Sequence, residues 1–250
     1  MLRRNLRHML RYPSMTLMLI SQPVVFLLLF VYVFGGQLGM GLGGPQGGRT
    51  GYADYVTPAI LLITVSSVAL ATAVSVAMDM TEGIVDRFRT MAIARASVLA
   101  GHVLGAMVQA AIALVVIVGV ALLVGFRPTA GPGAWAAAIG VLAIFTLALT
   151  WLTVALGLAA KSVETASNTP MVLVLLPFLG SGFVPTDSMP AGLREFAEHQ
   201  PFTPVTETLR GLLTGTPVGG SAVAAIAWSA GIGLASYLWA KYLYNRHSTS

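Results

Sequence analysis

Long apolar runs alternate with short polar segments along almost the whole chain. Five of these runs have the roughly 20 residues that a helix needs to cross the hydrocarbon core of a bilayer. They predict membrane-spanning helices over residues 16–34, 53–77, 98–124, 134–160 and 221–240. Pro23 falls inside the first run, where it predicts a kink.

A sixth apolar run, residues 167–184, is shorter. Its most apolar part, Pro170 to Val184, has 15 residues. As a helix it would rise only about 22 Å, against a hydrocarbon core of about 30 Å. A start near Ser167, or a locally thinner bilayer, would let it cross. We interpret it as the fifth of six spans, which predicts an all-α polytopic membrane protein, one domain over residues 1–250, with both termini on one side.

The composition supports this fold class. The chain is 56% hydrophobic and only 9% charged, and its mean hydropathy is +0.81. Soluble domains carry about 25% charged residues, so a soluble fold is excluded. The absence of cysteine and the four scattered histidines predict no metal site.

The distribution of basic residues predicts the orientation. With a cytoplasmic N-terminus, ten Lys and Arg lie inside and four outside, as the positive-inside rule requires. The inner residues are Arg3, Arg4, Arg7, Arg11, Arg87, Arg89, Arg95, Lys161, Lys241 and Arg246, and the outer ones are Arg49, Arg127, Arg194 and Arg210. Both termini are therefore expected in the cytoplasm. The basic residues form no continuous stripe, which argues against a nucleic-acid partner.

The first fifteen residues predict an amphipathic helix on the inner membrane surface. Apolar residues recur at helical spacing between four arginines, Arg3, Arg4, Arg7 and Arg11. Basic amphipathic helices of this kind lie in the interface of the lipid bilayer. The alternative interpretation is a simple basic flank that fixes the topology.

Residues 81–95, TEGIVDRFRTMAIAR, carry five charges between two long apolar runs. Glu82, Asp86 and Arg89 share one helical face, and Ile84 and Phe88 share another. Thr81 is placed to cap the start of this helix. The segment therefore predicts a short cytoplasmic amphipathic helix. It is either a solvated connector or, because topology needs no acidic residues, a surface for a polar protein partner.

Residues 185–219 predict a hairpin of two short amphipathic helices on the outer side. Prolines separate the stretches AGLREFAEH and VTETLRGLL, and each stretch has an apolar and a charged face. Helices of this kind suit re-entrant elements in the outer leaflet, and an ordinary surface loop is the alternative. The candidate residues are Pro185, Pro190, Phe196, Pro201, Pro204 and Arg210.

The first outer segment, residues 35–51, predicts a flexible Gly-rich loop. Within it, GGPQGGRT nearly fits a phosphate-binding loop, but Arg49 stands in the place of the lysine. The motif also needs a preceding strand, and an apolar helix precedes it here. We therefore expect no nucleotide site, and no cofactor, on this chain.

Together these stretches resemble a known family. Glu82 to Met91, EGIVDRFRTM, resembles the first cytoplasmic loop of type-2 ABC exporter permeases, especially daunorubicin-resistance-type drug exporters of actinobacteria. The N-terminal stretch LRRNLRHMLRYPSMTLMLISQPVVFLLLFVYVFGG and the outer stretch FVPTDSMPAGLREFAEHQPFTPVTETLRGLLTG resemble the same family. The resemblance covers nearly the whole chain.

The resemblance implies a permease of a bacterial plasma membrane that pairs with a second permease and with two separate ATPase subunits. ATP and magnesium would bind those partners, and not this chain. The helix over residues 81–95 would dock on the ATPase. The matching coupling residues are Glu82, Gly83, Asp86, Arg87, Phe88 and Arg89. The cargo would be an amphiphilic or lipid-like molecule, such as a drug, a lipid, a glycolipid or a polyketide.

Three other classes remain as alternatives. An ion-coupled carrier needs ionisable residues inside its spans, where this chain has few: Asp54 and Asp79 lie at span ends, and His102 lies about one turn into the third span. An intramembrane serine enzyme, hinted at by Ser181 between Gly180 and Gly182, needs a histidine base nearby. A structural membrane protein would not explain both the charged inner segment and the outer hairpin.

Overall fold

The structure, a computed structural model, describes residues 13–41, 48–81 and 96–246, and all regular elements in these ranges are helical. The α-helices are α2 (Pro13–Leu28), α3 (Gly35–Gly41), α4 (Arg49–Thr81), α6 (Ala96–Val124), α7 (Pro132–Ala159), α8 (Val163–Asn168), α9 (Met171–Leu175), α10 (Ala191–His199), α11 (Phe202–Thr214) and α12 (Ser221–Arg246). A π-helical turn, Leu29–Phe34, joins α2 to α3, and 3-10 turns cover Leu176–Leu179 and Thr186–Ser188.

Five helical runs in the described ranges are long and apolar enough to cross a membrane, which confirms five of the predicted spans. They are Leu19–Gly41, Arg49–Thr81, Leu99–Val124, Pro132–Ala159 and Ser221–Tyr244. The predicted limits differ most in the first two runs. Pro23 lies inside α2, as predicted. Thr81 ends α4, and its hydroxyl donates to the Met78 carbonyl at 3.0 Å.

The start of the predicted Gly-rich loop is helical. Residues 35–41 continue the first apolar run as α3, and the loop prediction is wrong for them. Within this helix Gly39 lies against the backbone of Gly48, the residue before α4, where a Cβ would collide. Glycine here allows close packing of two chain segments rather than flexibility.

The predicted fifth span, residues 167–184, is not one continuous helix of spanning length. The apolar helical run in this region, Val163–Leu179, has 17 residues and is shorter than the five long spans. It consists of α8, α9 and the 3-10 turn that follows. Pro170 and Pro177 lie at the starts of the latter two elements. Each proline lacks an N–H group, so one uninterrupted α-helical ladder cannot form.

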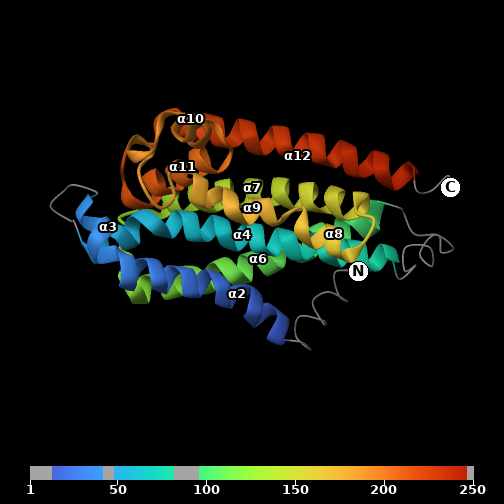
Figure 1. The fold of residues 1–250 in the computed structure, drawn as a ribbon, viewed down its shortest axis with the longest axis horizontal. Coiled ribbons are helices and arrows are strands. Elements are labelled where there is room, and N and C mark those ends of the chain that lie inside the picture. Colours follow the sequence, from blue (N-terminus) through green and yellow to red (C-terminus); the bar gives the residue numbers. More distant parts are fainter. Residues whose placement is uncertain (1–12, 42–47, 82–95, 247–250) are drawn as a thin grey trace.

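Helix α4 lies at the centre of the bundle. It packs against α2, α6, α7, α11 and the α8–α9 run, and Figure 1 shows these helices around it. In the most apolar 18-residue stretch of α4, 78% is buried, whereas the corresponding share is 17–44% in the other four spans. Helix α12 lies outside α7, along which it packs. The start of α2 and the ends of α4 and α12 point to the same end of the bundle, away from α10 and α11.

The two buried helices α4 and α7 approach each other closely at Gly157. A Cβ at this position would lie 2.6 Å from the Ala73 carbonyl oxygen and 3.1 Å from Val76 Cβ. The first distance is too short for real atoms, so a side chain would push the two helices apart. On the same helix, a Cβ at Gly140 would meet nothing within 4 Å.

We predict that Gly157→Ala destabilises the protein, while Gly140→Ala does not. Overpacking at a close helix contact costs about 1–3 kcal/mol, whereas alanine in place of an unconstrained helical glycine gains about 0.5–1 kcal/mol. The measurement is the thermal unfolding midpoint of each variant in detergent. Equal midpoints for the two variants would contradict the close contact.

Candidate functional site

The hairpin formed by α10 and α11 is the part of the described chain where candidate residues from the sequence come together. Prolines set its boundaries. Pro185 begins the 3-10 turn Thr186–Ser188, and Pro190 immediately precedes α10. Pro201 precedes α11, and Pro204 lies in its first turn, where a missing N–H costs no intrahelical bond. Gly215, at φ +74°, ends α11 in the left-handed region that favours glycine.

The two helices of the hairpin differ in burial. Helix α11 packs against α4, α7 and α12, and most of its residues are buried. In α10 only Ala197 is buried, and Phe196 and Leu193 are 46% and 40% exposed. Of the apolar residues that the sequence placed on one face of this helix, Ala197 packs inward, while Leu193 and Phe196 stay partly exposed. Helix α10 thus presents apolar side chains outward at this end of the bundle.

Arg210 on α11 joins three segments. Its Nε and Nη2 each donate to the Tyr55 carbonyl at 3.2 Å, and Nη2 also donates to the Ser181 carbonyl at 2.7 Å. The guanidinium carbon lies 3.7 Å from the centre of the Tyr55 ring, in cation–π contact. Burial lowers the pKa of Arg210, and the neighbouring Tyr55 and Glu207 act in the opposite direction. Because arginine has so high an intrinsic pKa, it stays charged at neutral pH.

Two tyrosines at the start of α4 hold the turn after the 3-10 segment. The Tyr55 hydroxyl donates to the Ser181 carbonyl at 2.9 Å, and the Tyr52 hydroxyl donates to the Phe183 carbonyl at 3.1 Å. The Ser181 carbonyl therefore accepts from both Tyr55 and Arg210. A Cβ at Gly182 would lie 2.6 Å from Ala59 Cβ, so glycine is needed for this approach to α4.

Gln200 and Thr203 bind the same turn from the hairpin. The Gln200 Nε2 donates to the Leu176 carbonyl at 3.3 Å, and Ser181 N donates to Thr203 Oγ1 at 3.3 Å. Gln200 also accepts from the Phe202 N–H at 3.2 Å. A Cβ at Gly180 would collide with both side chains. Glycine at positions 180 and 182 therefore allows this turn to pack closely against the hairpin and α4.

An aromatic cluster fixes this turn to the first span. The Phe178 and Phe183 rings stack with centroids 4.6 Å apart, and Phe30 in the π-helical turn lies 4.3 Å from Phe183. Phe26 makes an edge contact with Phe178 at 5.6 Å. The turn is therefore held between the first span, the start of α4 and the hairpin.

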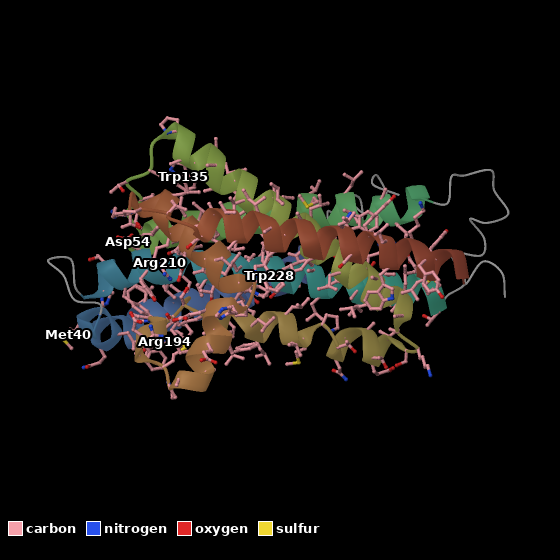
Figure 2. The ribbon with its side chains drawn as sticks, turned by 90° about the horizontal axis from the view of Figure 1, so that it is seen from above. Met40, Asp54, Trp135, Arg194, Arg210 and Trp228 are labelled. Atoms are coloured by element: carbon pink, nitrogen blue, oxygen red, sulfur yellow. The ribbon has the colours of Figure 1, made fainter. Side chains whose placement is uncertain are left out.

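Two more polar contacts close this end of the bundle. Asp54 Oδ1 accepts from the Arg127 backbone N–H at 2.7 Å, which joins α4 to the loop after α6. Glu207 Oε2 accepts from the Ser221 hydroxyl at 3.0 Å, which joins α11 to the start of α12. Figure 2 shows Arg210 and Asp54 at this end, with Arg194 on the outer side of the hairpin. The exposed Arg194 pairs with Asp187 at 2.7 Å and Glu198 at 2.8 Å.

Among the described residues, the polar side chains at this end of the bundle mainly position backbone segments. The Ser181 hydroxyl has no hydrogen-bond partner within the described residues. The nearest histidine in sequence, His199, contacts the Glu195 carbonyl through Nδ1 at 2.8 Å. Ser181 thus lacks the general base that a serine nucleophile needs.

Two predicted sites lie outside the described residues. These are the coupling residues Glu82, Gly83, Asp86, Arg87, Phe88 and Arg89, and the N-terminal arginines Arg3, Arg4, Arg7 and Arg11. Most of the stretch GGPQGGRT lies outside them too. Of the contacts at the hairpin, the sequence pointed to Arg210. The partners Tyr52, Tyr55, Gln200 and Thr203 carried no sequence signal, because each acts through a neighbour far away in the chain.

These features define a multi-pass helical membrane protein whose polar contacts gather at the ends of its spans. The profile of the ABC-2 type transporter family matches residues 1–214. This match covers most of the chain, and the chain belongs to the ABC-2 type transporter family.

The chain is also similar to curated drug-resistance permeases. It is 29% identical over 206 residues to the daunorubicin resistance ABC transporter permease protein DrrB1 of Streptomyces coeruleorubidus, covering 82% of this chain and 70% of that protein. It is 24% identical over 194 residues to the probable doxorubicin resistance ABC transporter permease protein DrrC of Mycobacterium tuberculosis, covering 78% of this chain and 70% of that protein. The predicted family is confirmed. The chain is a permease, a transport subunit and not an enzyme.

We predict that Arg210→Ala destabilises the hairpin and that Arg194→Ala has little effect. Loss of the Arg210 guanidinium removes charged donors from two carbonyls, at a cost of about 1–3 kcal/mol. The Arg194 ion pairs are exposed and screened by water. Thermal unfolding in detergent, together with limited proteolysis of residues 185–219, measures both effects. The Arg210→Lys variant, which keeps the charge without the planar fork, is expected to fall between wild type and Arg210→Ala. Equal proteolysis of the two alanine variants would show that Arg210 does not hold the hairpin against α4 and the turn at Ser181.

Proposed function

We propose that this chain is the membrane-spanning subunit of an ATP-driven exporter that moves an amphiphilic or lipid-like molecule out of the cytoplasm or the inner leaflet. The observation that carries the proposal is the family match over residues 1–214. ABC-2 permeases pair with an ATPase subunit. In our proposal two such ATPases and a second permease, identical or related, complete the transporter.

The chain crosses the membrane six times in this proposal. The broken run Val163–Leu179 supplies the fifth crossing, between α7 and the hairpin. Three facts support this: the apolar character of this 17-residue run, its packing along α4, and the position of α10 and α11 at the far end of the bundle. The excess of Lys and Arg then places both termini in the cytoplasm of a bacterial cell and the hairpin on the outer side.

The hairpin lies at the exit in this arrangement. Helix α10 dips into the outer leaflet with its exposed Phe196 and Leu193, while α11 is locked into the bundle by Arg210. Alternating opening of the interface between the two permeases would move cargo outward. The apolar span surfaces and the names of the related drug-resistance permeases support a drug, a lipid, a glycolipid or a polyketide as cargo.

In this proposal, residues 81–95 pass the movement driven by ATP hydrolysis from the ATPase to the membrane spans. Glu82, Asp86 and Arg89 dock on the ATPase by charge complementarity, and the N-terminal basic helix lies on the inner surface nearby. ATP and magnesium bind the ATPase. An ion-coupled carrier is the runner-up function, and membership of an ATP-driven family argues against it.

The direct test is affinity purification of the full chain from native membranes in mild detergent, followed by mass spectrometry. A stoichiometric nucleotide-binding ATPase is expected in the wild-type preparation. Purification without any ATPase, even after cross-linking, would overturn the exporter and favour the ion-coupled carrier.

We predict that the double charge reversal Glu82→Lys with Asp86→Lys lowers the amount of bound ATPase about tenfold or more, because like charges then face each other at the interface. The matched control is Asp187→Lys with Glu195→Lys, which reverses two charges of the outer hairpin. The control should retain the ATPase, and both variants should insert into the membrane normally. Undiminished ATPase binding in the first variant would move the docking site elsewhere.

A further inference from the structure

A buried acid–base pair lies at the end of the bundle opposite the hairpin. Asp79 is near the end of α4, and His102 is in the second turn of α6. His102 Nε2 lies 3.1 Å from Asp79 Oδ2. The two residues are 9% and 6% exposed. The sequence placed Asp79 at a span end and His102 about one turn into the third span, but it gave no sign that they touch.

Buried apolar residues lie close to the pair in sequence: Val76 is one turn before Asp79, and Leu99 and Val103 flank His102. A second hydrophobic cluster fills this end of the bundle, with side chains from α4, α6, α7 and α12. Its buried members are Val76, Leu99, Val103, Val154, Ala155, Leu158, Ala240 and Tyr244. A carboxylate in such surroundings needs a hydrogen-bond donor, since water cannot replace a lost one. His102 donates whether it is doubly protonated or neutral with its proton on Nε2.

The two residues of the pair lie on the two helices that the proposed docking segment connects. Helix α4 ends at Thr81, two residues after Asp79, and α6 begins at Ala96, six residues before His102. A force on residues 82–95 pulls on both helix ends. Separation of those ends would break the contact between His102 and Asp79.

We propose that Asp79 and His102 are positioning residues that clamp the ends of α4 and α6 together, so that a displacement of residues 82–95 moves the two helices as one unit. This inference rests on the proposed function, because it assigns the pair a role in passing the ATPase movement to the spans. The clamp acts through helix position and contacts neither ATP nor cargo.

The first test measures the distance between the two helices in the assembled transporter. The chain contains no cysteine, so spin labels can be placed with Met78→Cys and Leu104→Cys, at two exposed residues on α4 and α6. The complex with its ATPase is compared without nucleotide and after trapping with ATP and vanadate. We expect one narrow distance distribution that shifts by less than about 2 Å, within the range of small helix movements. A larger shift in the labelled chain with its pair intact would overturn the clamp.

The second test breaks and restores the pair in the same labelled chain. Asp79→Asn and His102→Gln should each broaden the distance distribution. Each should also lower the amount of doxorubicin, the transport probe, that is transported per ATP hydrolysed, by about five- to tenfold. The swap Asp79→His with His102→Asp should recover most of both. The matched control is Thr72→Val, a buried α4 hydroxyl that bonds its own helix at the Val68 carbonyl, and it should behave like wild type.

The outcomes separate this inference from the proposed function. A wild-type preparation without ATPase overturns the proposed function, and the coupling role falls with it. An assembled ATPase with unchanged distances in Asp79→Asn and His102→Gln overturns the clamp alone. A swap that recovers nothing, while its ATPase stays bound, also overturns it. If a single variant fails to fold, the labelled chain with its intact pair still decides the question.

Discussion

The enclosure of α4 on all sides is the constraint on which the rest of the structure depends. Polar groups on a helix buried in an apolar bundle must find partners without water. Along the middle of α4 they find them on the helix itself: the hydroxyls of Thr57, Thr64, Ser67 and Thr72 each donate to the carbonyl four residues earlier. Ser66 is an exception, with no hydrogen-bond partner within the described residues. The middle of the helix therefore meets its neighbours mainly through apolar packing.

Polar contacts between α4 and other segments lie near the two ends of this helix. Tyr52 and Tyr55 hold the turn at residues 181–183, and Arg210 binds the Tyr55 carbonyl. At the other end Asp79 meets His102. A 33-residue helix is about 50 Å long, and packed helices move as stiff elements. Helix α4 thus physically connects the hairpin to the end where the proposed docking segment begins.

The hydrophobic pattern was sufficient to predict the long spans, because apolar runs of about 20 residues in a chain with so few charges are typical of transmembrane helices. It failed where packing or backbone chemistry decides. The many glycines of residues 35–41 made a helix look like a loop, and Pro170 and Pro177 interrupt the predicted fifth span. Proline spacing correctly marked the hairpin. The hydrogen bonds from Arg210 to the Tyr55 and Ser181 carbonyls could not be predicted from the sequence. Every residue has a backbone carbonyl, so the acceptors leave no mark in the pattern of residue types.

The broken run Val163–Leu179 also bears on how the protein is made. The cell's insertion machinery sorts each segment by its apolarity as it leaves the ribosome, and α4, α6 and α7 are strong signals of this kind. A 17-residue run interrupted by prolines partitions into lipid much less readily by itself. If this run crosses the bilayer as proposed, its way in is along the surface of α4, which is synthesised about a hundred residues earlier. In the six-crossing arrangement, biogenesis of the C-terminal third therefore waits on correct assembly of the N-terminal helices.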